Sequence, residues 1–151
     1  MSRRDRHIRL CSCLLILNLC FIWGNSLMPA EVSQAFSDWV KALPSKLISG
    51  SGGGAGGSGI LRKTAHFTEF TALGLLLRWL HGLLGKKGWH ALFWGLLAAC
   101  IDETIQLFVP GRGPGLLDVG IDSCGVLTGM LLLQIGYVLR KRNQQNSNGG
   151  I

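Results

Sequence analysis

The sequence predicts an all-α protein: a small four-helix transmembrane bundle, with a short amphipathic outer helix between spans 1 and 2. Composition is the first observation, because the 151 residues are 48% hydrophobic, with a mean hydropathy of +0.34. The second observation is that only 15% of the residues are charged, against about 25% in average soluble domains. The third observation is that the apolar residues form four blocks, each near the roughly 20 helical residues that cross a membrane core. Helices satisfy their own backbone hydrogen bonds in lipid and are therefore the expected spanning form.

The predicted elements follow in order along the chain. A basic cytoplasmic N-terminus, residues 1–9, precedes a four-span domain over 10–139, and a cytoplasmic tail covers 140–151. We expect the polar part of this tail after Arg142, NQQNSNGG, to be disordered. The four spans lie near residues 10–28, 64–84, 89–109 and 116–139. The first resembles a signal peptide in its basic start, but no A-x-A cleavage site follows, so we expect it to remain as an uncleaved helix.

The longest predicted loop is the outer segment 29–63. Its first part, AEVSQAFSDWVKAL, spaces apolar residues at roughly helical intervals, which predicts the amphipathic helix, with Pro44 as its end. The glycines and serines of 49–59 predict a flexible linker. They follow no strand and precede no Lys-Ser/Thr pair, so they do not indicate a phosphate-binding loop. The later connections, GKKGW and PGRGPG, are short, which predicts antiparallel neighbouring helices.

The net charge of +7 is concentrated beside the predicted spans. If four helices alternate, ten of the fifteen basic residues fall on the side of the two termini. These ten are Arg3, Arg4, Arg6, Arg9, Arg78, Lys86, Lys87, Arg140, Lys141 and Arg142. The positive-inside rule then places both termini in the cytoplasm of a multi-pass cell-membrane protein. We interpret the basic groups as topology signals and lipid contacts, and we expect no nucleic-acid partner.

All five cysteines lie in predicted spans, where we expect them to be small buried apolar residues. They are Cys11, Cys13, Cys20, Cys100 and Cys124. Because they show neither C-x-x-C nor Cys/His spacing, they predict no zinc site.

Five of the eight acidic residues lie in or at the ends of predicted spans, where a carboxylate facing lipid is costly. In the alternating topology they all fall near the outer end of the bundle, at the same depth as four other polar residues. This polar cluster comprises Lys63, His66, Glu69, Asp102, Glu103, Gln106, Arg112, Asp118 and Asp122. At 100° per residue the members on each span share one helix face. Gly125 and Gly129 continue the face of the last span as a step that permits close helix packing. We therefore expect the cluster to point into the bundle.

Two interpretations of the polar cluster are open. It can be structural, with Arg112 pairing with Asp118 and Lys63 with an acid to hold the helices together. It can also be a working site, because ionisable groups within membrane spans mark function by default. We favour the second interpretation, since five carboxylates exceed what two fixed positive charges and one histidine need.

The motifs KTAHFTEF, DETIQLFVPGR and LLDVGIDSCGVLTG, in this order, resemble the VanZ-like family of bacterial membrane proteins. The resemblance covers residues 62–129 and the preceding first span, and it implies that the nine members of the polar cluster are the family's signature positions. The family often has Asn at the position of Asp122, and often Tyr or Ser at Phe70 or Gly113. Its founding member is associated with low-level resistance to teicoplanin, so the resemblance implies a role in the cell envelope.

Three functions compete. A binding protein would hold an anionic headgroup of a phospholipid, a lipid-linked cell-wall precursor or a glycopeptide, with Lys63 and Arg112 on phosphate. Its ligand-binding set would be Lys63, Gln106, Arg112, Asp118 and Asp122. A membrane-embedded enzyme would instead transfer a phosphoryl or acyl group on a lipid substrate. Its catalytic set would be His66, Glu69, Asp102 and Glu103, with the histidine in general acid/base catalysis.

The third function is transport or scaffolding, with the polar cluster as structural contacts. The sequence shows no organic-cofactor motif and specifies neither a metal nor an oligomeric state. A divalent cation is compatible with the carboxylates, because hard cations prefer oxygen ligands.

Overall fold

The computed structural model describes residues 2–29, 31–32, 35, 57–113 and 115–148, and within them the chain is all-α. Its long helices are α1 (Arg3–Ser26), α3 (Gly57–Leu83), α4 (Gly88–Leu107) and α5 (Leu116–Asn148). The described residues contain no strand, which confirms that the chain is all-α over this part. Most of the predicted amphipathic outer helix lies outside the described residues, and its three described residues, 31, 32 and 35, are helical. Most of the glycine-rich linker also lies outside the described residues.

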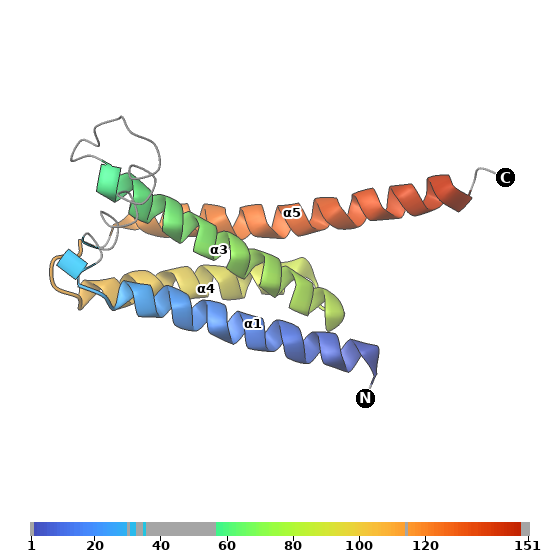
Figure 1. Ribbon diagram of the computed structural model, residues 1–151, viewed down its shortest axis with the longest axis horizontal. Coiled ribbons are helices and arrows are strands. Elements are labelled where there is room, and N and C mark those ends of the chain that lie inside the picture. The colour runs from blue at the N-terminus through green and yellow to red at the C-terminus, as the bar shows by residue number, and fades with distance from the viewer. Residues whose placement is uncertain (1, 30, 33–34, 36–56, 114, 149–151) are drawn as a thin grey trace, which may run out of the picture.

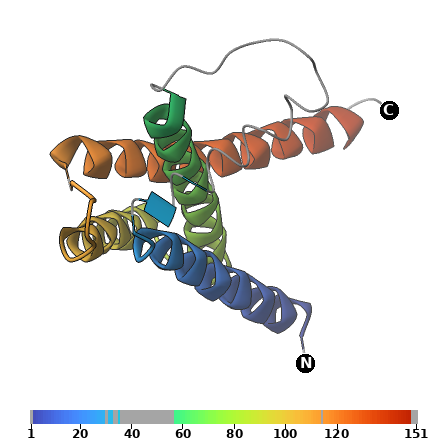
Figure 2. The same ribbon diagram turned by 60° about the vertical axis from the view of Figure 1, so that its left-hand side comes forward.

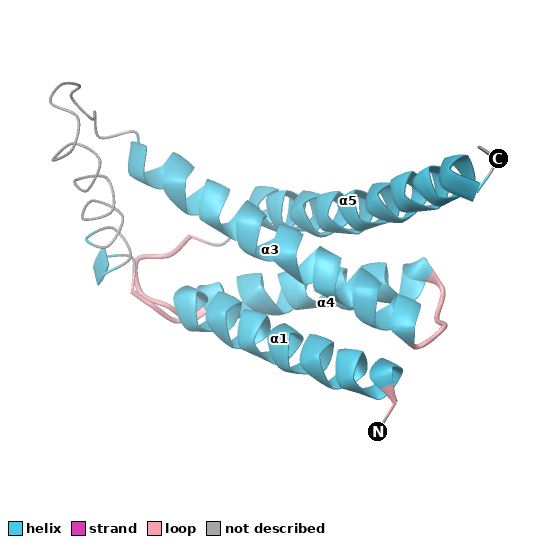
Figure 3. Cartoon of the chain, turned by 45° about the vertical axis from the view of Figure 1, so that its right-hand side comes forward, coloured by secondary structure: helices cyan, strands magenta, loops and turns pink. Residues whose placement is uncertain are grey.

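The helices run roughly side by side, and their connections alternate between the two ends of the bundle (Figure 1). The chain begins at the same end at which α3 passes into α4 and at which α5 finishes; we call this the terminal end. At the opposite end, α1 finishes, α3 begins and α4 passes into α5; we call this the site end. Both short connections can be followed in Figure 3. The antiparallel order predicted from the short turns is therefore confirmed.

Three helix boundaries differ from the prediction. A capping box starts α1 earlier than expected, because the Asp5 amide donates to the Ser2 hydroxyl and the Ser2 amide donates to the Asp5 carboxylate. The first residues of α3, from Gly57, occupy the end of the predicted linker. The predicted disordered tail is wrong up to Asn148, because α5 continues through it. Arginine, lysine and glutamine favour helices, and no glycine interrupts the tail before residue 149.

Glycines allow α3 and α5 to pack with their backbones almost in contact, and Figure 2 shows the two helices crossing. A Cβ atom on Gly125 would lie 2.7 Å from the carbonyl oxygen of Phe67, and one on Gly129 would overlap the carbonyl oxygen of Thr71. Gly74 on α3 meets the backbone of Val126 in the same way. This confirms the predicted close packing of the Gly125–Gly129 face, and it holds the polar residues of α3 and α5 in a fixed register.

The outer surface of the bundle is strongly apolar. Large side chains such as Leu17, Phe21, Phe93 and Leu131 are exposed, a pattern typical of a surface that contacts lipid. In the described part of the chain, two helices, Arg3–Ser26 and Leu116–Ser147, are long and apolar enough to cross a membrane. The other two, α3 and α4, carry most of the polar cluster, so polar residues lower their hydropathy. The predicted four-span bundle is thus supported for two helices.

The expectation that the cysteines are buried is wrong for four of the five. Only Cys11 is buried, whereas Cys13, Cys20, Cys100 and Cys124 are exposed on the outside of the bundle. A small apolar residue suits a lipid-facing helix surface as well as a core, and hydropathy cannot distinguish these two environments.

Candidate functional site

The structure brings the nine residues of the polar cluster to the site end, on three helices and one turn. Lys63, His66 and Glu69 come from α3. Asp102, Glu103 and Gln106 come from α4 and are buried there. Arg112 lies in the turn after α4, and Asp118 and Asp122 lie in the first two turns of α5. The prediction that these groups point into the bundle is confirmed for the buried members, Asp102, Glu103, Gln106, Arg112 and Asp122.

Asp102 is the centre of the site and is completely buried. One of its oxygens accepts a hydrogen bond from the Ser26 hydroxyl at 2.7 Å, and the other accepts one from the Gln106 amide at 2.8 Å. The same Gln106 amide lies 3.3 Å from the Ser26 hydroxyl. These contacts join α1 to α4 and fix the orientation of the carboxylate.

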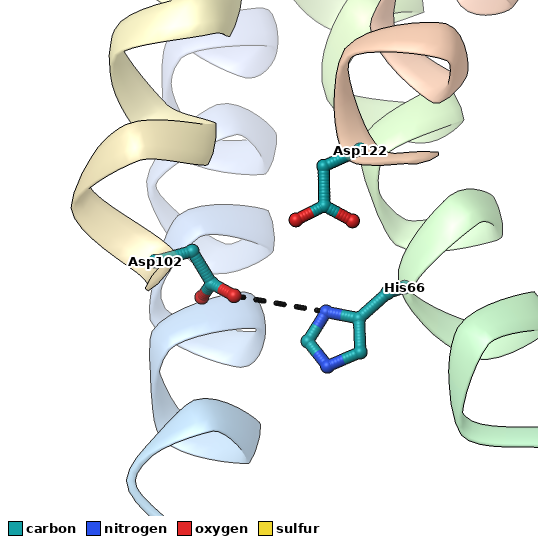
Figure 4. Close-up of side chains that lie close together, drawn as sticks. All are labelled: His66, Asp102 and Asp122. Atoms are coloured by element: carbon teal, nitrogen blue, oxygen red, sulfur yellow. Dashed lines mark ion pairs between the residues drawn. The ribbon is translucent and has the colours of Figure 1, made fainter. Parts of the chain in front are cut away.

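His66 and Asp122 face Asp102 from α3 and α5 (Figure 4). The Nδ1 atom of His66 lies 3.7 Å from a carboxylate oxygen of Asp102 and has no hydrogen bond within the described residues. Asp122 is 2% exposed, and no hydrogen bond or ion pair joins its carboxylate to another described residue. One possible ligand atom from each of the three residues lies within 4.8 Å of those of the other two. The centre of the site is therefore two buried carboxylates and an imidazole nitrogen that face one another.

A small cavity opens beside this centre. Its open volume is about 10 Å³, which is room for a single water molecule. Six members of the polar cluster line it together with Arg62 and Ile121, namely Lys63, His66, Glu103, Gln106, Asp118 and Asp122. Glu103 accepts a hydrogen bond from the Gly115 amide on one oxygen, while its other oxygen is buried without a partner among the described residues. The cavity wall thus carries unsatisfied acceptors.

Basic residues of α3 form the edge of the cavity. Lys63 is half-exposed and pairs with Asp118 at 3.0 Å. Arg62 lies next to it and lines the same cavity. The predicted pairing of Lys63 with an acid is thus confirmed, with Asp118 as the acid.

Arg112 binds the end of α1 rather than an acid. Its Nε donates to the carbonyl of Met28 at 3.0 Å, and one terminal nitrogen donates to the carbonyl of Asn25 at 2.7 Å. Gly111 precedes it with φ = 75°, a conformation that glycine adopts without strain. Burial lowers the pKa of the Arg112 guanidinium from its ordinary value, and the carboxylates of Asp102 and Glu103 act in the opposite direction. The predicted pairing of Arg112 with Asp118 is wrong, because the guanidinium donates instead to backbone carbonyls at the end of α1.

Sequence reasoning missed three residues of the site. Asn25 donates a hydrogen bond to Glu69 at 2.8 Å, and Ser26 donates to Asp102. Arg62 lines the cavity beside Lys63. A signal was present for the first two, because they are polar residues at the end of an apolar span and lie at the same depth as the polar cluster.

Comparison with known proteins identifies the family. A family model described as VanZ/LLP1 matches residues 11–137, which includes the whole polar cluster. This confirms the resemblance to VanZ-like proteins found in the sequence motifs. Comparisons with curated proteins and with solved structures give no match.

Proposed function

Because the chain belongs to the VanZ/LLP1 family, we propose that it is a multi-pass envelope membrane protein that binds an anionic headgroup at the outer leaflet. The ligand would be a phospholipid or a lipid-linked envelope component. The observation that carries the proposal is the cavity at the site end, with Arg62 and Lys63 at its edge above buried polar groups. A link to teicoplanin resistance is part of the same proposal, since a protein that engages envelope lipids can change how a lipid-bearing glycopeptide reaches its target.

The charge distribution supports an outer location for the cavity. The terminal end carries both chain termini and the turn with Lys86 and Lys87, and all ten basic residues predicted to lie on one side belong to this half of the bundle. The positive-inside rule assigns such an end to the cytoplasm. The site end then faces outward. In this proposal α3 and α4 also cross the membrane, and their polar residues are tolerated because they face the bundle interior.

Lys63 and Arg62 are the cations best placed to hold a phosphate. The Lys63 side chain is 46% exposed, and its ion pair with Asp118 is accessible to water. Exposed ion pairs contribute about 0–1 kcal/mol, so a headgroup can displace Asp118 at little cost. Arg112 is committed to the carbonyls of α1 and in this proposal positions the turn instead of contacting the ligand.

A second feature supports a ligand with an acyl chain. An apolar groove of about 240 Å³ lies between α1, α3 and α4. Its lining includes Trp23 and Ile101, which lie on the same helices as Ser26 and Asp102, within one turn of them. Polar groups for a headgroup and an apolar groove for an acyl chain therefore lie at neighbouring positions on the same helices, which is the arrangement that a lipid ligand requires.

The test is binding of short-chain phosphatidylglycerol to the full chain in detergent micelles, with short-chain phosphatidylcholine as the zwitterionic control. We expect saturable binding of the anionic lipid only, weakened about tenfold or more by Lys63→Ala or Arg62→Ala, because each removes about 1.5–3 kcal/mol of charge-assisted hydrogen bonding. Lys86→Ala, which removes a lysine at the opposite end, should bind like the unchanged protein. Equal binding by all these variants would contradict the proposal.

A second function is favoured by the contact between His66 and Asp102. A buried carboxylate held by Ser26 and Gln106 faces the imidazole at 3.7 Å, close enough for a small movement to form the hydrogen bond found in sites where a histidine moves protons. The reaction would be phosphoryl or acyl transfer on a lipid substrate. Mass spectrometry of membrane lipids from cells that carry the unchanged protein or His66→Ala distinguishes the two functions. A lipid species that requires His66 supports the enzyme, whereas identical lipid profiles support the binding protein.

A further inference from the structure

We propose that His66, Asp102 and Asp122 form a binding site for one divalent transition-metal cation, with Zn²⁺ as the ion tested. The inference does not depend on headgroup binding, because its ligands are distinct from Lys63 and Arg62, which lie at the edge of the cavity. Three helices contribute one ligand each, so the ion would tie α3, α4 and α5 together at the site end.

Uncompensated charge is the first argument for a cation. Asp102 and Asp122 are 0% and 2% exposed, and carboxylates buried to this degree require a partner of opposite charge or a proton. Among the described residues no cation forms an ion pair with Asp122 and no lysine or arginine forms one with Asp102, since Lys63 pairs with Asp118 and Arg112 donates its hydrogen bonds to carbonyls of α1. A divalent cation between the two carboxylates neutralises both.

Unsatisfied ligand atoms are the second argument. The Nδ1 atom of His66 is buried and makes no hydrogen bond within the described residues, and Figure 4 shows both carboxylates on that side of the ring. A buried imidazole nitrogen without a partner is costly unless it coordinates something. The carboxylate of Asp122, which no described residue contacts through a hydrogen bond, is aimed into the same space.

The distances between the ligand atoms of the three residues fit a bound metal ion once these atoms move closer together. The ligand atoms lie within 4.8 Å of one another, and the Nδ1 atom of His66 is 3.7 Å from Asp102. Tetrahedral metal–ligand bonds of about 2.0–2.2 Å place ligand atoms about 3.3–3.6 Å apart, so the His66–Asp102 separation already nearly fits and the widest separation must close by roughly 1 Å. Asp122 can supply this movement, because its carboxylate is not held by another described group.

The surroundings resemble those of metal sites in two respects. Ligating carboxylates are usually held by hydrogen bonds, and Asp102 accepts one on each oxygen, from Ser26 and Gln106. Three protein ligands leave a coordination position for water, and the cavity beside them has room for one water molecule. An imidazole nitrogen favours zinc or a similar transition metal over Mg²⁺ and Ca²⁺, which take oxygen ligands.

The experiment measures the metal content of the full, untagged chain in detergent. The protein is stripped with chelator, incubated with Zn²⁺ or with Mg²⁺, desalted and analysed by elemental mass spectrometry. We expect one Zn²⁺ per chain and no Mg²⁺, with a rise in the thermal unfolding midpoint on addition of Zn²⁺. His66→Gln and Asp122→Asn should lose both the ion and the rise, whereas Asp118→Asn, a matched change one turn away on α5, should keep both.

Competition with a coloured chelator gives the affinity. Gln106→Ala leaves all three ligands in place and should weaken zinc binding about 10–100-fold, as removal of a supporting hydrogen bond typically does. Circular dichroism of every variant checks that the helices persist. No zinc on the unchanged protein, or equal zinc on Asp122→Asn and Asp118→Asn, overturns the proposal. Lys63→Ala should keep zinc even where it loses headgroup binding, so the metal site and the headgroup site can fail separately.

Discussion

The two ends of the bundle differ in how far their charged side chains are exposed to water. At the terminal end, Arg4 donates two hydrogen bonds to the carbonyl of Leu83 at the end of α3 and remains exposed to solvent. At the site end, Arg112 makes the same kind of contact to the end of α1 but is only 8% exposed. Each arginine donates to backbone carbonyls at the end of a helix. The difference is that the site end keeps its charges away from water, where each unsatisfied group is costly.

This difference explains why the site end, and not the terminal end, is the candidate for function. Buried groups that lack partners among the described residues, such as one oxygen of Glu103 and the Nδ1 atom of His66, cost stability in the absence of a ligand. A fold that retains them gains something else from them, such as binding or catalysis. At the terminal end water can solvate the charges, so the basic residues there need no such explanation.

Arg112→Ala should have the largest effect. It removes two charge-assisted hydrogen bonds, each worth about 1.5–3 kcal/mol, which the largely buried guanidinium donates to the carbonyls of Asn25 and Met28. We expect the free energy of unfolding to fall by about 3–5 kcal/mol, measured by denaturant titration in detergent micelles. Arg4→Ala at the terminal end should cost about 0.5–1 kcal/mol, because water replaces the lost donor. Equal losses would show that burial does not distinguish the two ends.

Gly129→Ala should have an intermediate effect. The added methyl group would meet the backbone carbonyl of Thr71, and a backbone atom cannot move aside as a flexible side chain can. Overpacking of this kind costs about 1–3 kcal/mol, and separation of α3 from α5 would also open the cavity. Gly136→Ala, two turns further along α5 and with nothing near its Cβ position, should be neutral or stabilising by up to about 1 kcal/mol.

Thermal unfolding of these two glycine variants and the unchanged protein, in the same detergent, gives the comparison. Loss of stability in Gly136→Ala equal to that in Gly129→Ala would mean that close packing is not confined to the site half of α5.

The composition of the site could be predicted from the sequence because depth and helical angle are local properties. Alternating spans placed Lys63, Asp102 and Asp122 at one level, and 100° per residue placed them on inward faces. The partner of Arg112 could not be predicted in this way. Its acceptors are backbone carbonyls of α1, and their position depends on where that helix ends in space.

Helix ends and lipid-facing positions were also predicted poorly from the sequence. Hydropathy marks where a span leaves the membrane but not where the helix stops, so the extension of α5 to Asn148 was missed. The exposed cysteines were missed for a related reason, since an apolar environment can be either core or lipid. Ser26 was missed because a single hydroxyl hardly changes the hydropathy of a span.

Lys63→Ala should have the smallest effect on stability. Its ion pair with Asp118 is half-exposed, so water screens it, and pairs of this kind contribute about 0–1 kcal/mol. We expect a fall of at most about 1 kcal/mol in the free energy of unfolding, close to that of Lys86→Ala at the terminal end. If Lys63→Ala also loses anionic lipid, the loss then reflects a missing ligand contact and not a damaged fold. A fall above about 2 kcal/mol would instead make the Lys63–Asp118 pair a structural contact and would count against the headgroup proposal.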